Sequence, residues 1–183
     1  MCGFTIGRAS YFKQFTVVEV QQTFYDPPAL ATLARWRDEA PPGFQFAMKA
    51  WQVITHFGSS PTYRRLVSPF SESEREEAGG FRLTTTVLRA WEKTLECARA
   101  LRATAILFQC PASFRPTDEN IDAMRAFFET PSCVRRRHPT CCTGGCTATE
   151  ATTHATATMS FVNCVGGWRA TSTRTSSSTT SRA

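Results

Sequence analysis

The sequence predicts an α/β protein built on a parallel sheet. Three short segments have the apolar pattern of β-strands, and a segment with helical periodicity follows each of them. The expected strands cover residues 16–25, 44–49 and 105–109. The order strand, helix, strand, helix, strand, helix is typical of parallel strands that are joined by right-handed crossovers.

Each expected strand has its own signal. Residues 16–25 open with a β-branched run, which favours extended structure. Residues 44–49 alternate large apolar side chains with Gln45, Ala47 and Lys49, as the period of two in a strand requires. Residues 105–109 form a short apolar run of the length expected for a buried strand.

The helices are predicted from their starts and their apolar faces. Asp26 followed by two prolines predicts a helix start, because Asp can accept from free backbone amides and proline suits the first turn. Residues 83–101 form the clearest helix, and Pro116–Glu119 starts another. The apolar residues at helical spacing are Ala29, Leu33, Trp36 and Ala40, then Val87, Trp91, Leu95 and Ala98, then Ile121, Met124 and Phe128. Residues 55–80 are expected to form a polar surface loop that includes the acidic stretch 72–77.

The composition divides the chain at Thr130. Residues 1–130 hold 15 of the 21 Lys and Arg, 14 of the 15 Asp and Glu, and 13 of the 14 Phe, so they have core-forming content and a balance of +1. Residues 131–183 have a balance of +5, hold 20 Ser or Thr, and lack Leu and Ile. We therefore expect one folded domain over 1–130 and a disordered tail over 131–183, since the tail can bury little apolar surface.

Three interpretations of the tail compete with simple disorder. The abrupt loss of Leu, Ile and Lys favours a frameshifted reading of a GC-rich gene, which translation of the other two frames would test. Zinc binding is disfavoured because no paired C-x2-C sites occur among Cys133, His138, Cys141, Cys142, Cys146 and His154. The run Arg135–Arg137 could contact the phosphates of a nucleic acid. The tail nearly lacks aromatic residues that could stack on bases, however, so the sequence argues against a nucleic-acid partner.

The compartment is predicted from what the sequence lacks. No run of about 18 apolar residues could span a membrane, and residues 1–8 lack the pattern of a secretory signal. The eight cysteines match no disulfide framework that we can identify, and five of them lie in the tail. These features predict a cytoplasmic protein without a membrane partner.

Polar residues gather on one face of the predicted sheet. If the large apolar residues of each strand face the covering helices, then Glu19, Gln21, Lys49 and Gln109 point the other way. Ligands of parallel α/β proteins bind at the carboxyl ends of strands. A pocket there would use Lys49 to hold an anionic or carbonyl group and His56 to move a proton. The alternative is a structural ion pair of Lys49 with Glu19 inside an amide network.

Three segments in this order resemble the YecE-like proteins, domain-of-unknown-function family seventy-two. They are residues 17–25, residues 43–56 and residues 107–114. The resemblance covers about residues 2–130 and implies a TIM-type (β/α)8 barrel of unestablished activity, sometimes described as related to sugar isomerases. The positions carried over by motif are Glu19, Thr23, Phe24, Tyr25, Lys49, His56, Gln109, Pro111 and Phe114.

The resemblance also shows departures. Residues 1–4 match only the end of the family's first strand, and the later strand with a Glu-Pro-Arg-Gly type motif is missing. Since a complete barrel needs roughly 250 residues, we expect a truncated barrel of roughly the first four βα units with a disordered C-terminal tail. Exposed strand edges would favour self-association.

Three functions follow as expectations. The first is an enzyme-like protein with a small-molecule pocket, in which the catalytic candidates are Glu19, Lys49 and His56 and the substrate-binding candidates are Gln21, Thr23, Tyr25 and Gln109. The second is a binding module that acts through the basic tail. The third is an inactive truncated product. The sequence identifies no metal ligands and no cofactor.

Overall fold

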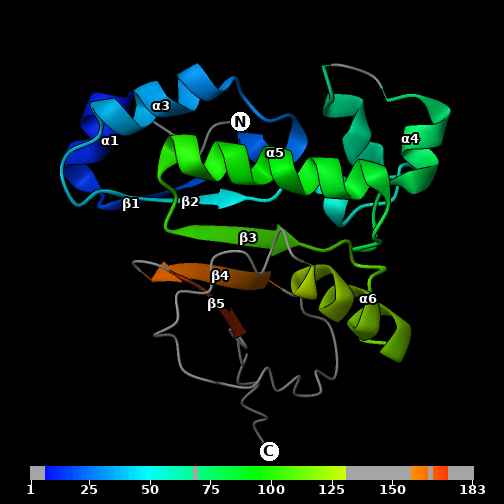
Figure 1. The fold of residues 1–183 in the computed structure, drawn as a ribbon. Helices are drawn as coiled ribbons and strands as arrows, with labels where there is room; N and C mark the ends of the chain where they lie inside the picture. Colours follow the sequence, from blue (N-terminus) through cyan, green and yellow to red (C-terminus); the bar gives the residue numbers. More distant parts are fainter. Residues whose placement is uncertain (1–6, 68–69, 131–157, 165–166, 173–183) are drawn as a thin grey trace, which may run out of the picture.

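The structure is a computed structural model, and it describes residues 7–67, 70–130, 158–164 and 167–172 (Figure 1). The helices are α1 Arg8–Gln14, α2 Gln22–Tyr25, α3 Leu30–Glu39, α4 Glu72–Glu77, α5 Thr85–Leu101 and α6 Asp118–Glu129. Two 3₁₀ helices are η1 Gln52–Ile54 and η2 Pro61–Arg65. The strands are β1 Val17–Val20, β2 Gln45–Lys49, β3 Ala105–Gln109, β4 Thr158–Cys164 and β5 Gly167–Ser172.

The predicted parallel sheet is present in β1, β2 and β3. Strand β1 pairs with β2 and β2 pairs with β3, both in parallel, and α3 and α5 cover one face (Figure 1). In the register of the pairs, Glu19 lies beside Ala47 and Lys49 beside Leu107. The described chain is thus a mixed α/β protein with a small, open sheet whose three parallel strands are joined by helices.

Two further strands lie in the segment that the composition predicted to be disordered. Strand β4 pairs antiparallel with β3, and β5 pairs antiparallel with β4, which extends the sheet to the order β1-β2-β3-β4-β5. An average over the whole tail hid the run 158–164, which mixes aromatic, β-branched and small residues suited to a strand. The expected strand remnant at 1–4 and the rest of 131–183 lie outside the described residues.

The first predicted strand is too long. Strand β1 ends at Val20, and the next residues turn into the short helix α2. The hydroxyl of Thr23 lies 3.0 Å from the backbone oxygen of Val20, and this contact favours the turn. A side-chain bond of this kind competes with the sheet, and the period-two pattern of the sequence does not reveal it.

The predicted start of the next helix is also wrong. Helix α3 begins at Leu30 with Ala29 as its N-cap, and Asp26 ends α2 in an extended conformation. Asp26 precedes a proline, which disfavours helical geometry at that residue. The predicted inner face of the helix is confirmed where Leu33 and Trp36 are buried.

The region predicted as a polar loop contains local structure. Its acidic stretch forms α4, which starts with a capping box in which Ser71 and Glu74 each bond the other's backbone amide. The spacing of Ser and Glu three residues apart is the known signature of such a start. The N-caps of helices α5 and α6 are Thr84 and Thr117, whose hydroxyls accept from the amides of Val87 and Asn120. The predictions of helices near 83–101 and after Pro116 are therefore confirmed.

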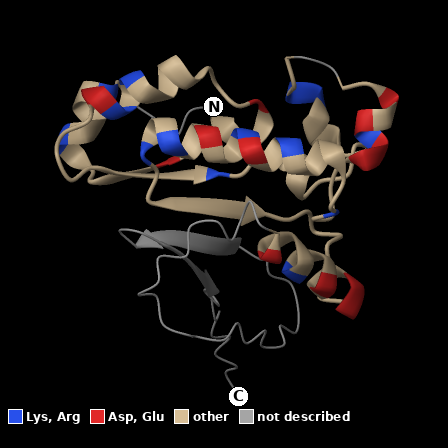
Figure 2. Cartoon of the chain, viewed as in Figure 1, with Lys and Arg blue, Asp and Glu red and all other residues tan. Residues whose placement is uncertain are grey.

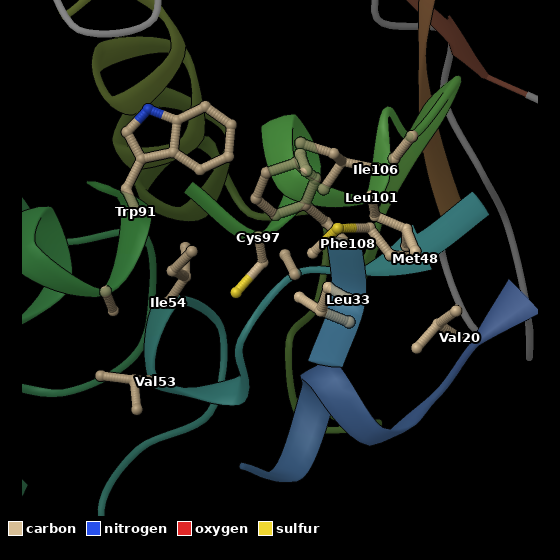
Figure 3. Packing of buried hydrophobic residues seen from close by; sticks show 14 of the residues in the cluster. Val20, Leu33, Met48, Val53, Ile54, Trp91, Cys97, Leu101, Ile106 and Phe108 are labelled. Atoms are coloured by element: carbon tan, nitrogen blue, oxygen red, sulfur yellow. The ribbon is translucent and has the colours of Figure 1, made fainter. Parts of the chain in front are cut away.

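The main core lies between the parallel strands and the covering helices (Figure 3). Each strand sends alternate residues inward, and these meet the inner faces of α3 and α5. The contributing side chains include Val20, Leu33, Met48, Cys97, Leu101, Ile106 and Phe108. This alternation confirms the predicted facing of the strands and leaves the opposite face for polar residues.

Aromatic rings join α6 to this core. Phe81, which has a positive φ of 57°, packs against Phe108, Phe127 and Phe128 with ring centroids 5.5 to 5.8 Å apart. Phe127 is fully buried and also contacts Trp91 at 5.7 Å. Helix α6 is therefore held on the end of β3 by edge-to-face aromatic packing.

Within the described residues, no helix combines the length and the apolar character needed to cross a membrane.

Candidate functional site at the carboxyl ends of the strands

Three polar side chains converge where the parallel strands end. The Nζ atom of Lys49 donates to Oε1 of Gln109 at 2.7 Å and lies 3.5 Å from Oε1 of Glu19. The three residues come from β2, β3 and β1, respectively. We call Glu19, Lys49 and Gln109 the strand-end trio.

The sheet register explains this convergence. Lys49 is the last residue of β2 and Gln109 the last of β3, so both lie at the same end of the sheet. Their neighbours Met48 and Phe108 are buried in the core, which turns Lys49 and Gln109 to the other face. The facing that alternation predicted for the trio is therefore confirmed.

The electrostatics of the trio combine a charge pair with access to solvent. The side chain of Lys49 is 20% exposed and that of Glu19 is 40% exposed. The ammonium is thus largely shielded by its surroundings and remains partly accessible to solvent. Strand β3 carries no charged residue (Figure 2), so its polar contribution to the trio is the amide of Gln109.

Hydrogen bonds lock the loops around the trio. The hydroxyl of Thr23 donates to the backbone oxygen of Lys49 at 2.7 Å. The backbone oxygen of Tyr25 accepts from the indole Nε1 of Trp51 at 3.3 Å and from Nε2 of Gln52 at 3.0 Å. The segments after β1 and β2 are consequently fastened to each other by three bonds.

His56 is buried beneath the loops that follow β1 and β2. It is 5% exposed, its Nδ1 lies 2.8 Å from Oγ1 of Thr55, and its backbone oxygen accepts from the hydroxyl of Tyr63. Burial lowers the pKa of His56 from 6.5 to about 4, so its imidazole is neutral near pH 7. The ring of Phe24 contacts His56 at 5.1 Å and lies 6.0 Å from Nζ of Lys49. The ring of Phe24 therefore lies between His56 and Lys49, and His56 is connected to the trio only indirectly.

The remaining sequence-predicted binding residues differ in placement. Gln21 is exposed at the N-cap of α2, and Thr23 is buried with its hydroxyl used by the backbone. Tyr25 is half-buried, and the guanidinium of Arg65 lies 4.3 Å from the centre of its ring. Among these residues, Tyr25 offers a ring surface beside the site.

Sequence reasoning missed two residues beside the strand ends. Gln52 is fully buried, and within the described residues its Oε1 has no hydrogen-bond partner. A polar residue inside the apolar run Trp51–Ile54 was the available signal. Arg65 lies far along the chain in η2, and no pattern in the sequence placed it against Tyr25.

The described residues include no group of three or more His, Cys, Asp or Glu side chains able to hold a metal ion. The six Cys and His residues of the tail that were considered as zinc ligands all lie outside the described ranges. The chemistry available at the strand ends is therefore that of an ammonium, a carboxylate, an amide and neighbouring aromatic rings.

The fold and the trio define a class of protein, an α/β chain whose parallel strands present polar side chains at their carboxyl ends. Within that class, the family model described as "Protein of unknown function DUF72" matches residues 8–179. The chain belongs to this family, as the YecE-like resemblance predicted. The match extends past Thr130 and so includes most of the segment that the composition set apart. Searches of curated proteins and of solved structures found no match.

Proposed function

We propose that the protein binds a small carbonyl compound at the strand-end trio and is enzyme-like in its arrangement. The observation that carries the proposal is the ammonium of Lys49, held between Oε1 of Gln109 at 2.7 Å and Oε1 of Glu19 at 3.5 Å at the ends of parallel strands. Parallel α/β proteins bind their ligands in this location. A pair of opposite charges there is suited to polarise a carbonyl group.

The trio suggests a division of roles. The ammonium of Lys49 donates to the carbonyl oxygen of the ligand and stabilises negative charge that develops on it. The carboxylate of Glu19 accepts a proton from the hydroxyl-bearing carbon next to the carbonyl, which gives an enediolate. It then returns that proton to the former carbonyl carbon, while the proton of the hydroxyl group passes to the former carbonyl oxygen. Gln109 accepts from Lys49 and keeps it oriented. This proton transfer is the step that aldose–ketose isomerisation requires.

His56 fits a supporting role in this proposal. Its neutral imidazole packs on Phe24, whose ring also lies near Lys49, and its Nδ1 is held by Thr55. Thr23 and Tyr25 then position the loops, and Gln21 lies at the exposed rim.

The fold part of the proposal is a partial TIM-type barrel. Three parallel strands, each followed by a helix, and polar residues at the carboxyl ends support it. Within the described residues, β1 has one paired edge, through β2, and Val17 is 48% exposed. An open edge of this kind would promote self-association, which analytical ultracentrifugation over a concentration series tests.

Ligand binding by variants separates this function from a purely structural ion pair. The wild-type chain is screened by thermal shift against aldoses and ketoses, and hits are measured by calorimetry. Lys49→Met and Glu19→Gln should each weaken a hit by about tenfold or more, since each removes a charged hydrogen-bonding group.

The control variant is Lys93→Met on α5, because Lys93 forms an ion pair with Glu96 at the same 3.5 Å. Lys93→Met should leave the affinity unchanged. Binding that survives both trio substitutions, or no binding of any compound by wild type, would contradict the proposal and favour an inactive product.

A further inference from the structure

We infer that Arg65 provides a second anchor, for a phosphate group, so that the preferred ligands of the strand-end site are phosphorylated carbonyl compounds. This inference rests on the proposed function and names its substrate class. The juxtaposition that carries it is Arg65 stacked on Tyr25, beside loops that are locked to the end of β2.

The charge of Arg65 is less compensated than that of Lys49. Lys49 and Glu19 form an ion pair, so their formal charges offset each other and the trio alone attracts a dianion weakly. Arg65 differs, because within the described ranges no carboxylate forms a salt bridge with it. Its charge is therefore available to an anionic group of a ligand.

Arg65 is linked to Lys49 through two aromatic rings. The guanidinium of Arg65 lies 4.3 Å from the centre of the Tyr25 ring. The rings of Tyr25 and Phe24 are 5.0 Å apart, and Phe24 lies 6.0 Å from Nζ of Lys49. Two adjacent aromatic rings therefore lie between the two cations. Because Phe24 is 2% exposed, a ligand that contacts both cations would pass over the half-buried ring of Tyr25.

The surroundings of Tyr25 restrict its movement. Trp51 and Gln52 donate to its backbone oxygen, its ring packs on the buried ring of Phe24, and Thr23 is bonded to the backbone of Lys49. Stacking on a fixed ring restricts the guanidinium before a ligand arrives, which reduces the entropy lost on binding. A planar guanidinium also matches phosphate oxygens in a bidentate way, which suits Arg better than Lys to this role.

The experiment compares matched ligands and matched variants of the full chain. The ligand pairs are ribose 5-phosphate with ribose, glucose 6-phosphate with glucose, and fructose 6-phosphate with fructose, each measured by calorimetry. Wild type should bind at least one phosphorylated compound about tenfold or more tightly than its unphosphorylated partner. Arg65→Gln should remove that preference and leave the affinity for the unphosphorylated sugar unchanged.

Arg64→Gln is the control, because Arg64 directly precedes Arg65 in η2 and is exposed as Arg65 is. It should keep the preference for the phosphorylated compound. Arg65→Lys retains the positive charge and should keep part of the preference for the phosphorylated compound. Such a result would show that the change in Arg65→Gln does not arise from unfolding.

The outcomes separate the two proposals. If Lys49→Met abolishes binding of both members of a pair while Arg65→Gln affects neither, the carbonyl site stands and the phosphate anchor is wrong. If wild type does not distinguish any phosphorylated compound from its partner, or if Arg64→Gln acts like Arg65→Gln, the phosphate anchor is also wrong. If wild type binds no member of any pair, both proposals fail.

Discussion

The hydroxyl of Thr23 donates a 2.7 Å hydrogen bond to the backbone oxygen of Lys49. The same hydroxyl lies 3.0 Å from the backbone oxygen of Val20, so one buried oxygen links the ends of two neighbouring strands. Lys49 thus has its backbone held by the loop after β1 and its side chain held by Gln109 from β3. Both kinds of contact fix the ammonium relative to the sheet.

Replacing Thr23 by valine should destabilise the protein. Thr23→Val keeps the shape of the side chain and removes the donor from the part-buried backbone oxygen of Lys49, which should cost about 1 to 3 kcal/mol of unfolding free energy. Urea denaturation measures the difference. Thr16→Val, at an exposed position just before β1, should change the free energy by less than about 0.5 kcal/mol. Equal effects of the two substitutions would contradict a structural role for the Thr23 hydroxyl.

Acid should destabilise the protein partly through His56. Its pKa is about 4 in the folded chain, below the ordinary value of 6.5, because burial disfavours the imidazolium. Between these values the unfolded chain binds a proton that the folded chain does not, so the free energy of unfolding falls as the pH decreases through this window. From pH 7 to pH 4 the loss from this residue should be about 2 to 3 kcal/mol.

His56→Asn isolates this contribution. The carboxylates of Glu39, Glu74 and Glu77, whose pKa values are lowered chiefly by hydrogen bonds, remain in both proteins and also lose stability on acidification. The difference between wild type and variant therefore reports the histidine. A difference that stays constant from pH 7 to pH 4 would show that His56 titrates normally in the folded state.

Two glycines with positive φ should respond differently to alanine. Gly79 has a φ of +87°, and a Cβ there would lie 2.5 Å from the carbonyl carbon of His56. Gly43 has a φ of +79°, and a Cβ there would meet no atom within 4 Å. Gly43→Ala should therefore cost about 1 to 2 kcal/mol from backbone strain alone. Gly79→Ala should cost at least about 2 kcal/mol more, because backbone must move.

Thermal unfolding of the two alanine variants provides the measurement. Near-equal melting temperatures of the two variants would mean that the backbone at Gly79 moves easily to admit a Cβ atom. The contact with Gly79 would then not hold the backbone of His56 in place.

The cap of α5 should be worth a measurable amount of stability. The Thr84 hydroxyl accepts from the amide of Val87 at 3.3 Å and donates to the backbone oxygen of Glu77 at 2.8 Å. Thr84→Ala should cost about 1 to 2 kcal/mol in urea denaturation. Thr85→Ala, one residue further on at an exposed position, is the matched control and should have little effect. A larger loss in the control would contradict the assignment of Thr84 as the cap.

Two cysteines should resist alkylation in the folded protein. Burial raises the pKa of Cys97 to about 11 and that of Cys110 to about 12, so neither thiol ionises appreciably at pH 8. Iodoacetamide labelling followed by mass spectrometry should find both peptides unmodified natively and modified in urea. Rapid native labelling of Cys97 or Cys110 would show that the core opens locally.

The elements with strong apolar periodicity were predictable from the sequence. Helix α5 and strands β2 and β3 lie where their patterns placed them, because each buries one face against the same core. The boundaries of β1 and α3 were not predictable from periodicity, since Thr23 and a pair of prolines decide them locally. Average composition obscured β4, which pairs with the edge of β3, and β5, which pairs with β4.

The residues of the candidate site also include some that the sequence pattern predicts and some that it does not. Alternation along the strands brought Glu19, Lys49 and Gln109 to one face, because side-chain direction in a strand has a fixed period. Arg65 was not predictable, since its position depends on the path of η2 over Tyr25 and on no periodic pattern. The neutral state of His56 likewise results from burial by residues distant in the sequence.

The sequence separations at the strand ends set an order for folding. The bond between Thr23 and Lys49 joins residues 26 positions apart, whereas the bond between Lys49 and Gln109 joins residues 60 positions apart. Closing the longer loop costs more entropy, and during synthesis its far end leaves the ribosome later. The unit formed by β1, α3 and β2 can therefore assemble on the nascent chain before β3 exists, and the ammonium of Lys49 gains its amide partner only when β3 docks.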